Sequence, residues 1–354
     1  VTKDNTVVFG GYEGGGTGCA NGHTWEAKYE HDKDLPYEAG VNPRVYLVDH
    51  WFFANLEHKD WNGEDCSYGG TAVSYGYAID KKGNMWVSTL DRDQLYWIDL
   101  DKRRSCSWGV DNPYGISIDY AGRIWLGSWT SDYAIAHVFV PETKTMHHIE
   151  RNTNEDWWWS GTNLGSNTHT RGTAASTDAN HPFGYAAMSN GVGGVVKMEV
   201  LDENPATFKA RVSGVLRTSN NGVCANSLSA SGIGLDGQGD LWLVHMDVCG
   251  NSNFDGKSHG SAVSIEMDKD KVAGWKHPSS GADVHDIVKS ITDTGSHTYT
   301  YSDFMGYQYA TVVSPTGWYV QRFHGWGSVD PAFSTEWTQV DVALVEAAPN
   351  PPLY

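Results

Sequence analysis

Short runs of small or alternating apolar residues recur along this chain, and each run leads through a glycine-containing turn into an aromatic segment. The three clearest copies occupy residues 76–86, 115–125 and 232–242, and each carries an Asp-x-x-Gly-x-x-Trp motif. A weaker copy occupies 314–320. Two period-two runs joined by a glycine turn predict a β-hairpin, and helical periodicity is almost absent, so we expect an all-β fold.

The hairpins recur at a fixed interval. The turn glycines at 83, 122, 239 and 317 are separated by 39, 117 and 78 residues, each a multiple of 39. A hairpin repeated about every 40 residues predicts a β-propeller, here with six or seven four-stranded blades. We expect one propeller domain, 1–345, and a Pro-rich tail or linker, 346–354. Five blades are expected near 72–110, 111–150, 170–218, 228–280 and 305–345. A sixth should contain 6–9 and 44–48 and be shared by both chain ends. A seventh blade, if there is one, would lie within 276–304.

Each residue of the repeated motif has an expected structural role. The glycine adopts a positive φ, and the aspartate accepts hydrogen bonds from the backbone of the turn. The tryptophan fills the space between neighbouring blades. These residues therefore build the scaffold, and functional residues are expected in the long loops and at the channel mouth.

Charge and hydropathy restrict the partners. The formal net charge is −18, so no nucleic-acid partner is expected, because such a partner needs a basic footprint. No apolar stretch approaches the roughly 18 residues that cross a membrane, so no membrane insertion is expected. An acidic surface is compatible with bound cations, neutral sugars and an exported protein, and it also simply keeps a protein soluble.

Five cysteines are present, and none belongs to a Cys-x-x-Cys pair. Cys224 and Cys249 flank one predicted hairpin and form the first expected disulfide. A second expectation joins Cys19 to Cys66 or Cys106, and one cysteine then stays free. Disulfides, together with a first residue other than Met, predict a secreted, periplasmic or cell-surface protein. The chain has no Asn-x-Ser/Thr acceptor, which favours a bacterial source.

Residues 112–126 resemble the repeat of streptogramin B lyases (virginiamycin B lyases), which reads Pro-x-Gly-Ile and then Asp-x-x-Gly-x-Ile-Trp. NHL-repeat and gluconolactonase-like propellers are similar at this level. The resemblance implies a propeller that opens a cyclic lactone by metal-assisted elimination, with His and Glu side chains at the channel mouth. That family often places a Glu three residues after the Trp, where this chain has Thr89, Ser128 and His245. Only His245 therefore has suitable chemistry among these positions.

The densest polar stretch is 245–259. Within it Asn251, Asn253 and Asp255 copy the first half of a calcium loop, and alternating oxygen ligands of this kind can hold calcium or magnesium. The closing Glu of such a loop is replaced by Ala262. A divalent cation is therefore one interpretation, and an Asn/Asp-rich turn is the other.

Four histidines are candidate catalytic residues at the channel mouth. His245 ends a predicted strand and is the candidate general base, and His169, His181 and His324 accompany it. The alternative for each is a hydrogen-bonded structural histidine at a strand end. Two arginines are candidates for binding a carboxylate of the ligand, Arg171 and Arg322.

Three consecutive tryptophans follow Asp156 in a long insert. Side chains alternate along a strand, so they cannot all face inward, and at least one is expected on the surface. Exposed indole rings stack on sugars and occur at protein interfaces, which makes Trp157 and Trp158 candidate ligand-binding residues. Packing of the insert against the side of the propeller is the alternative.

Two functions remain open at this point. The first is an exported ligand-binding propeller, resembling streptogramin lyases, that acts on a small molecule as a metal-assisted lyase or hydrolase. The second is a non-catalytic extracellular surface or assembly module that binds a glycan or a protein through exposed aromatic residues. A metal or a deep pocket at the axis favours the first, and a large exposed aromatic patch favours the second.

Overall fold

The described part of the computed structural model has twenty-one β-strands, and no helix in it is long or apolar enough to span a membrane. Side chains are described for residues 56–67, 75–89, 93–129, 134–150, 169–189, 194–214, 230–235 and 241–245. The backbone alone is described for strand residues 6–10, 23–30, 44–52, 215–217, 260–265, 288–295, 318–321 and 337–340.

The strands form six sheets, in each of which a strand pairs with its neighbour in sequence. All the pairings are antiparallel, as expected for consecutive hairpins. Four sheets have four strands: β4 (Gly76–Ile79), β5 (Met85–Thr89), β6 (Gln94–Asp99) and β7 (Arg104–Gly109); β8 (Pro113–Ile118), β9 (Ile124–Ser128), β10 (Ala134–Val140) and β11 (Thr145–Glu150); β12 (His169–Ala175), β13 (Phe183–Ser189), β14 (Gly194–Asp202) and β15 (Lys209–Arg217); β16 (Ala230–Leu235), β17 (Leu241–His245), β18 (Gly260–Ile265) and β19 (Val288–Gly295). The other two are β1 (Thr6–Gly10), β2 (His23–Glu30) and β3 (Arg44–Phe52), and β20 (Trp318–Gln321) with β21 (Trp337–Val340).

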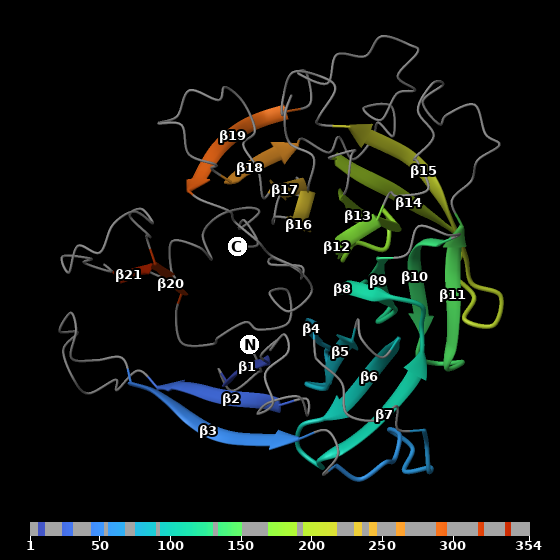
Figure 1. Cartoon of the computed structure of the whole chain (residues 1–354), viewed down its shortest axis with the longest axis vertical. Helices are drawn as coiled ribbons and strands as arrows, with labels where there is room; N and C mark the ends of the chain where they lie inside the picture. Colours follow the sequence, from blue (N-terminus) through green and yellow to red (C-terminus); the bar gives the residue numbers. More distant parts are fainter. Residues whose placement is uncertain are drawn as a thin grey trace.

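The four-stranded sheets fan out from a common centre (Figure 1). The first strand of each sheet lies innermost, and the last lies at the outside. Neighbouring inner strands contact one another, β4 with β8, β8 with β12 and β12 with β16. Meandering sheets with this radial order make the fold an all-β propeller, as the repeat predicts.

The structure also tests where the blades lie. The blades predicted at 72–110, 111–150 and 170–218 are confirmed as the sheets that begin with β4, β8 and β12. The blade predicted at 228–280 extends further, because its last strand is β19. This strand lies inside 276–304, where a seventh blade was expected. The total number of blades and the sharing of one blade by both chain ends stay predictions.

Two copies of the repeated motif form the predicted turn. Asp80 accepts hydrogen bonds through Oδ1 from two backbone N–H groups of the turn, both at 2.9 Å. Its Oδ2 accepts one from Trp86 Nε1 at 3.1 Å. The turn at 119–125 repeats these bonds. Gly83 and Gly122 have φ values of 85° and 86°, a conformation that glycine adopts without strain.

Two of the motif tryptophans, Trp86 and Trp125, lie between blades, as predicted. Trp125 is buried and meets the ring of Phe208 in the next sheet edge-on, with centroids 6.5 Å apart. Gly184 leaves space for this indole, which a Cβ at that position would overlap. Trp86 lies 5.7 Å from the ring of Phe139 in the next sheet. These large buried rings supply much of the apolar contact that joins one blade to the next.

A buried histidine, His137, predicts acid sensitivity. His137 on β10 is fully buried, and its Nδ1 is 2.8 Å from Nδ1 of His148 on β11. Burial, and secondarily the His148 ring, lowers the pKa of His137 from 6.5 to about 3. Between these values the unfolded chain binds a proton that the folded chain does not, so stability falls as the pH falls from about 6.5 towards 3.

We therefore expect His137 to lower the free energy of unfolding by about 2 kcal/mol at about pH 5 relative to neutral pH. The His137→Gln variant should flatten that part of the curve of stability against pH, measured by urea denaturation. A His137→Gln slope equal to that of the wild type would show that this group does not titrate on unfolding.

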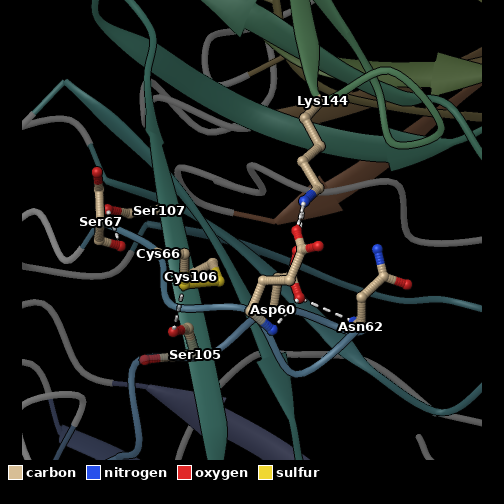
Figure 2. The surroundings of a disulfide bond; sticks show 9 residues. Asp60, Asn62, Cys66, Ser67, Ser105, Cys106, Ser107 and Lys144 are labelled. Carbon is tan, nitrogen blue, oxygen red and sulfur yellow. Dashed lines mark hydrogen bonds and ion pairs between the residues drawn. A yellow bond between two sulfur atoms is a disulfide. The ribbon is translucent and has the colours of Figure 1, made fainter.

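Residues 56–67, which we call the strap, lie along the outer strand β7. Ser105 N–H donates to the Glu57 carbonyl at 2.9 Å, and Ser107 N–H donates to the Ser67 carbonyl at 3.0 Å. A disulfide joins Cys66 of the strap to Cys106 of β7 (Figure 2), with the Cα atoms 5.7 Å apart. The strap is therefore fixed to the first four-stranded sheet by both backbone and covalent bonds.

This disulfide corrects one prediction from the sequence. Cys19 was expected to pair with Cys66 or Cys106, whereas these two cysteines pair with each other. Their partnership depends on the strap returning to an outer strand 40 residues away, which no local pattern indicates. The predicted bond between Cys224 and Cys249 lies outside the described residues.

The strap also contains a copy of the repeated turn. Asp60 Oδ1 accepts hydrogen bonds from the N–H groups of Asn62 and Glu64 at 2.8 and 3.0 Å, and Gly63 has a φ of 84°. No tryptophan follows at the motif position, and Oδ2 is bonded instead by Lys144 Nζ from the turn between β10 and β11 (Figure 2). The strap thus ties the first four-stranded sheet to the second.

Candidate functional site

The inner strand of each sheet begins at the edge where the second strand ends. His169 at the start of β12 is paired with Ser189, as Gly76 is paired with Ser88 in the first four-stranded sheet. We call this the upper edge of the propeller, and the edge that carries the Asp-Gly turns the lower edge. Because inner strands of successive sheets are in contact, side chains from several blades meet at the upper edge.

Four rings from three blades form a continuous stack at the upper edge. Tyr75 precedes β4, and its ring meets that of Tyr114 on β8 with centroids 4.3 Å apart and hydroxyls 2.5 Å apart. Tyr114 stacks on Trp129 at 5.0 Å, and Trp129 stacks on His169 at 4.6 Å. We call these four residues the aromatic stack. Tyr114 is buried, whereas the other three are half-buried and keep part of their surface exposed.

A cation lies against the same stack. Arg171 is two residues after His169 on β12, and its guanidinium carbon is 5.0 Å from the centroid of the Trp129 ring. The side chain is 7% exposed, so its charge is largely removed from water. A guanidinium over an indole face is a favourable cation–π arrangement, and its planar N–H groups suit a carboxylate.

The tautomer of His169 follows from its hydrogen bond. Nδ1 of His169 is bonded to the backbone carbonyl of Trp129. A carbonyl can only accept, so the proton is on Nδ1, and Nε2 is the basic nitrogen of the neutral ring. This arrangement makes Nε2 the atom at which His169 can accept a proton.

The structure brings together two of the predicted site residues, His169 and Arg171, and separates others. His245 also ends its strand at the upper edge, in the next sheet, where it pairs with Ala230. It is fully buried, and burial lowers its pKa to about 4. His181 follows the other end of β12, in the turn before β13, and therefore lies towards the lower edge.

His181 has a local partner in that turn. Its Nδ1 is 2.9 Å from Asp178 Oδ2, and this hydrogen bond lowers the pKa of the Asp178 carboxyl. The contact is typical of a polar turn, in which an Asp side chain bonds a residue a few positions away. The other predicted site residues lie outside the described residues: Trp157, Trp158, Asn251, Asn253, Asp255, Arg322 and His324.

The described side chains include no group of three or more His, Cys, Asp or Glu residues that could hold a metal ion. The predicted divalent cation, calcium or magnesium, stays an expectation because its ligands lie elsewhere in the chain.

Sequence reasoning missed the tyrosines and Trp129. A signal for the tyrosines was present, because Tyr75 and Tyr114 are one repeat of 39 residues apart and each precedes a glycine of an inner strand. Trp129 follows β9 directly and carries no motif of its own.

Comparisons with known proteins concern the fold alone. No protein-family model matches the chain, and no curated protein sequence matches it. Among solved structures, the chain is similar to a streptogramin B lyase at 12% identity and a TM-score of 0.40, over 79% of this chain and 63% of the other. An auxiliary nutrient binding protein from Bacteroides thetaiotaomicron matches at 8% identity and 0.39, over 80% and 58%. Hydrazine synthase from Kuenenia stuttgartiensis matches at 14% and 0.39, over 56% and 52%.

The chain thus spans less than two thirds of each of these three proteins. Activity does not follow from similarity at this level, since one fold supports many functions.

Proposed function

We propose that the protein is an exported ligand-binding β-propeller whose ligand site lies at the upper edge, around the aromatic stack and Arg171. The observation that supports this most directly is the convergence of the stack and a nearly buried guanidinium from three successive blades. The combination suits a planar organic anion, with its ring against the exposed part of the aromatic stack and its carboxylate on Arg171.

Catalysis at this site would depend on His169. His245 has a pKa of about 4, so it is a weak base at neutral pH. His169 is half-buried and has Nε2 as its basic nitrogen. In a lyase or hydrolase reaction we therefore assign proton abstraction to His169, and binding of the anionic group to Arg171.

Export of the protein is supported by its disulfide bond. The Cys66–Cys106 disulfide persists in oxidising compartments and is rare in a reducing cytosol. A secreted, periplasmic or cell-surface location is therefore part of the proposal.

We expect the wild-type protein to bind naphthoate, a planar aromatic carboxylate, in isothermal titration calorimetry. Trp129→Ala should weaken this binding about tenfold or more, because it removes the central ring of the stack. Arg171→Lys should also weaken it, since lysine keeps the charge but loses the planar fork.

Trp108→Phe, a ring change on β7, is the control and should bind naphthoate as the wild type does. Thermal melts of all variants show whether each one is folded. Equal affinities of the wild type and a folded Trp129→Ala variant would overturn the proposed site.

A further inference from the structure

A cavity lies at the lower edge, far from the aromatic stack along the inner strands. It has a volume of about 250 Å³ and lies between the first two four-stranded sheets, where the turns after β4 and β8 approach the strap. Three tryptophans line it, Trp61 of the strap, Trp86 of β5 and Trp97 of β6. Charged side chains of the turns complete the lining, among them Lys82 and Glu142.

The tryptophans form a fixed corner. The rings of Trp61 and Trp97 meet edge-on with centroids 5.4 Å apart, and Trp61 is 6.3 Å from Trp86. Trp86 and Trp97 are each 2% exposed and form the floor, whereas Trp61 is half-buried and presents ring surface. The indole N–H of Trp86 is held by Asp80, so this ring cannot turn freely.

Trp61 owes its position to the strap rather than to a blade. The disulfide holds one end of the strap to β7, and Lys144 of the next sheet binds Asp60 beside Trp61. The Lys144 ammonium is also 5.6 Å from the centroid of the Trp61 ring. An aromatic ring that is held in place before binding loses little conformational freedom when a ligand stacks on it.

The lining selects the chemistry of a ligand. An apolar ring face suits Trp61, and hydroxyl groups around that ring suit the ammonium of Lys82 and the carboxylate of Glu142. The volume is slightly below the roughly 300–1,000 Å³ of sites for drug-sized ligands. It therefore fits a single sugar ring better than an extended chain.

We infer that this cavity is a binding site for one pyranose residue of a saccharide, with Trp61 as the stacking platform. The site is independent of the proposed upper-edge site, because the two share no residue and lie at opposite edges of the sheets. The aromatic residues of this cavity differ from Trp157 and Trp158, which the sequence predicts as ligand-binding residues.

The test uses saturation-transfer difference NMR on the full chain. The probes are the methyl glycosides of glucose, galactose and mannose, together with glucuronate. We expect saturation transfer from the protein to the ring protons of at least one probe. Trp61→Ala should abolish the transfer, and Trp61→Phe, which keeps a ring, should retain part of it.

Two control variants locate the site. Trp108→Phe changes a ring 5.6 Å from Trp61 that is not part of the cavity lining, so the transfer should persist. Trp129→Ala at the upper edge should also leave it unchanged, and this separates the two proposals. The inference is overturned if the wild type shows no transfer with any of the four probes. It is equally overturned if a probe binds and a folded Trp61→Ala variant binds it as well.

Discussion

Replacement of Asp119 by alanine is expected to lower the free energy of unfolding by about 3 to 5 kcal/mol. Asp119 Oδ1 accepts hydrogen bonds from the N–H groups of Ala121 and Arg123 at 3.0 and 2.9 Å. Its Oδ2 accepts from Arg123 Nε at 2.5 Å and from Trp125 Nε1 at 3.0 Å. Without the carboxylate, a guanidinium that is 3% exposed would remain buried and uncompensated.

The matched control is Asp80→Ala in the preceding blade. Asp80 makes the same bonds to its turn and to Trp86, but Asn84 stands where the second turn has Arg123. This variant therefore loses hydrogen bonds without leaving a buried charge, and we expect a loss of about 2 kcal/mol.

Urea denaturation of both variants measures the difference, which reports the buried charge together with the deeper burial of the Asp119 turn. Equal losses in the two variants would show that Arg123 finds another partner or leaves the interior.

The contrast between these turns shows why part of the fold is readable in the sequence. All hydrogen bonds of the Asp80 carboxylate lie within six residues, so spacing alone predicts them. The turn at Asp60 has the same backbone bonds, yet its Oδ2 partner is Lys144, 84 residues away. Sequence reasoning relied on the Trp of the motif and so did not recognise this copy.

The candidate site shows the same limit at longer range. His169 and Arg171 could be proposed because imidazole and guanidinium groups two residues apart on a strand are conspicuous. Their neighbours Tyr114 and Trp129 belong to another blade, and contact between blades follows from the radial arrangement of the sheets. His181 follows His169 closely in the sequence, but the whole of the inner strand β12 separates the two histidines in space.

Removal of the disulfide by Cys66→Ser with Cys106→Ser is the second large expected effect. The bond closes a loop of 40 residues. Loop-closure entropy predicts a loss of unfolding free energy between about 3 kcal/mol, the value for a short loop, and about 4.7 kcal/mol, the value for a long one. Denaturant unfolding of the oxidised wild type and the double variant measures this loss.

A reducing agent provides the control for this measurement. Reduction of the Cys66–Cys106 bond should lower the stability of the wild type to that of the double variant. If the reducing agent also lowers the stability of the double variant, that loss would report another disulfide, such as the predicted Cys224–Cys249 bond. Wild-type stability in the double variant would mean that the bond does not constrain the unfolded chain.

The same double variant connects stability with the lower-edge cavity. Without the disulfide, the strap keeps its backbone bonds to β7 and the ion pair between Asp60 and Lys144. Trp61 would then be held less firmly, and the ring would have to be ordered when a sugar binds. We therefore expect weaker saturation transfer in the folded double variant than in the wild type, and a further decrease when Lys144→Met removes the ion pair with Asp60.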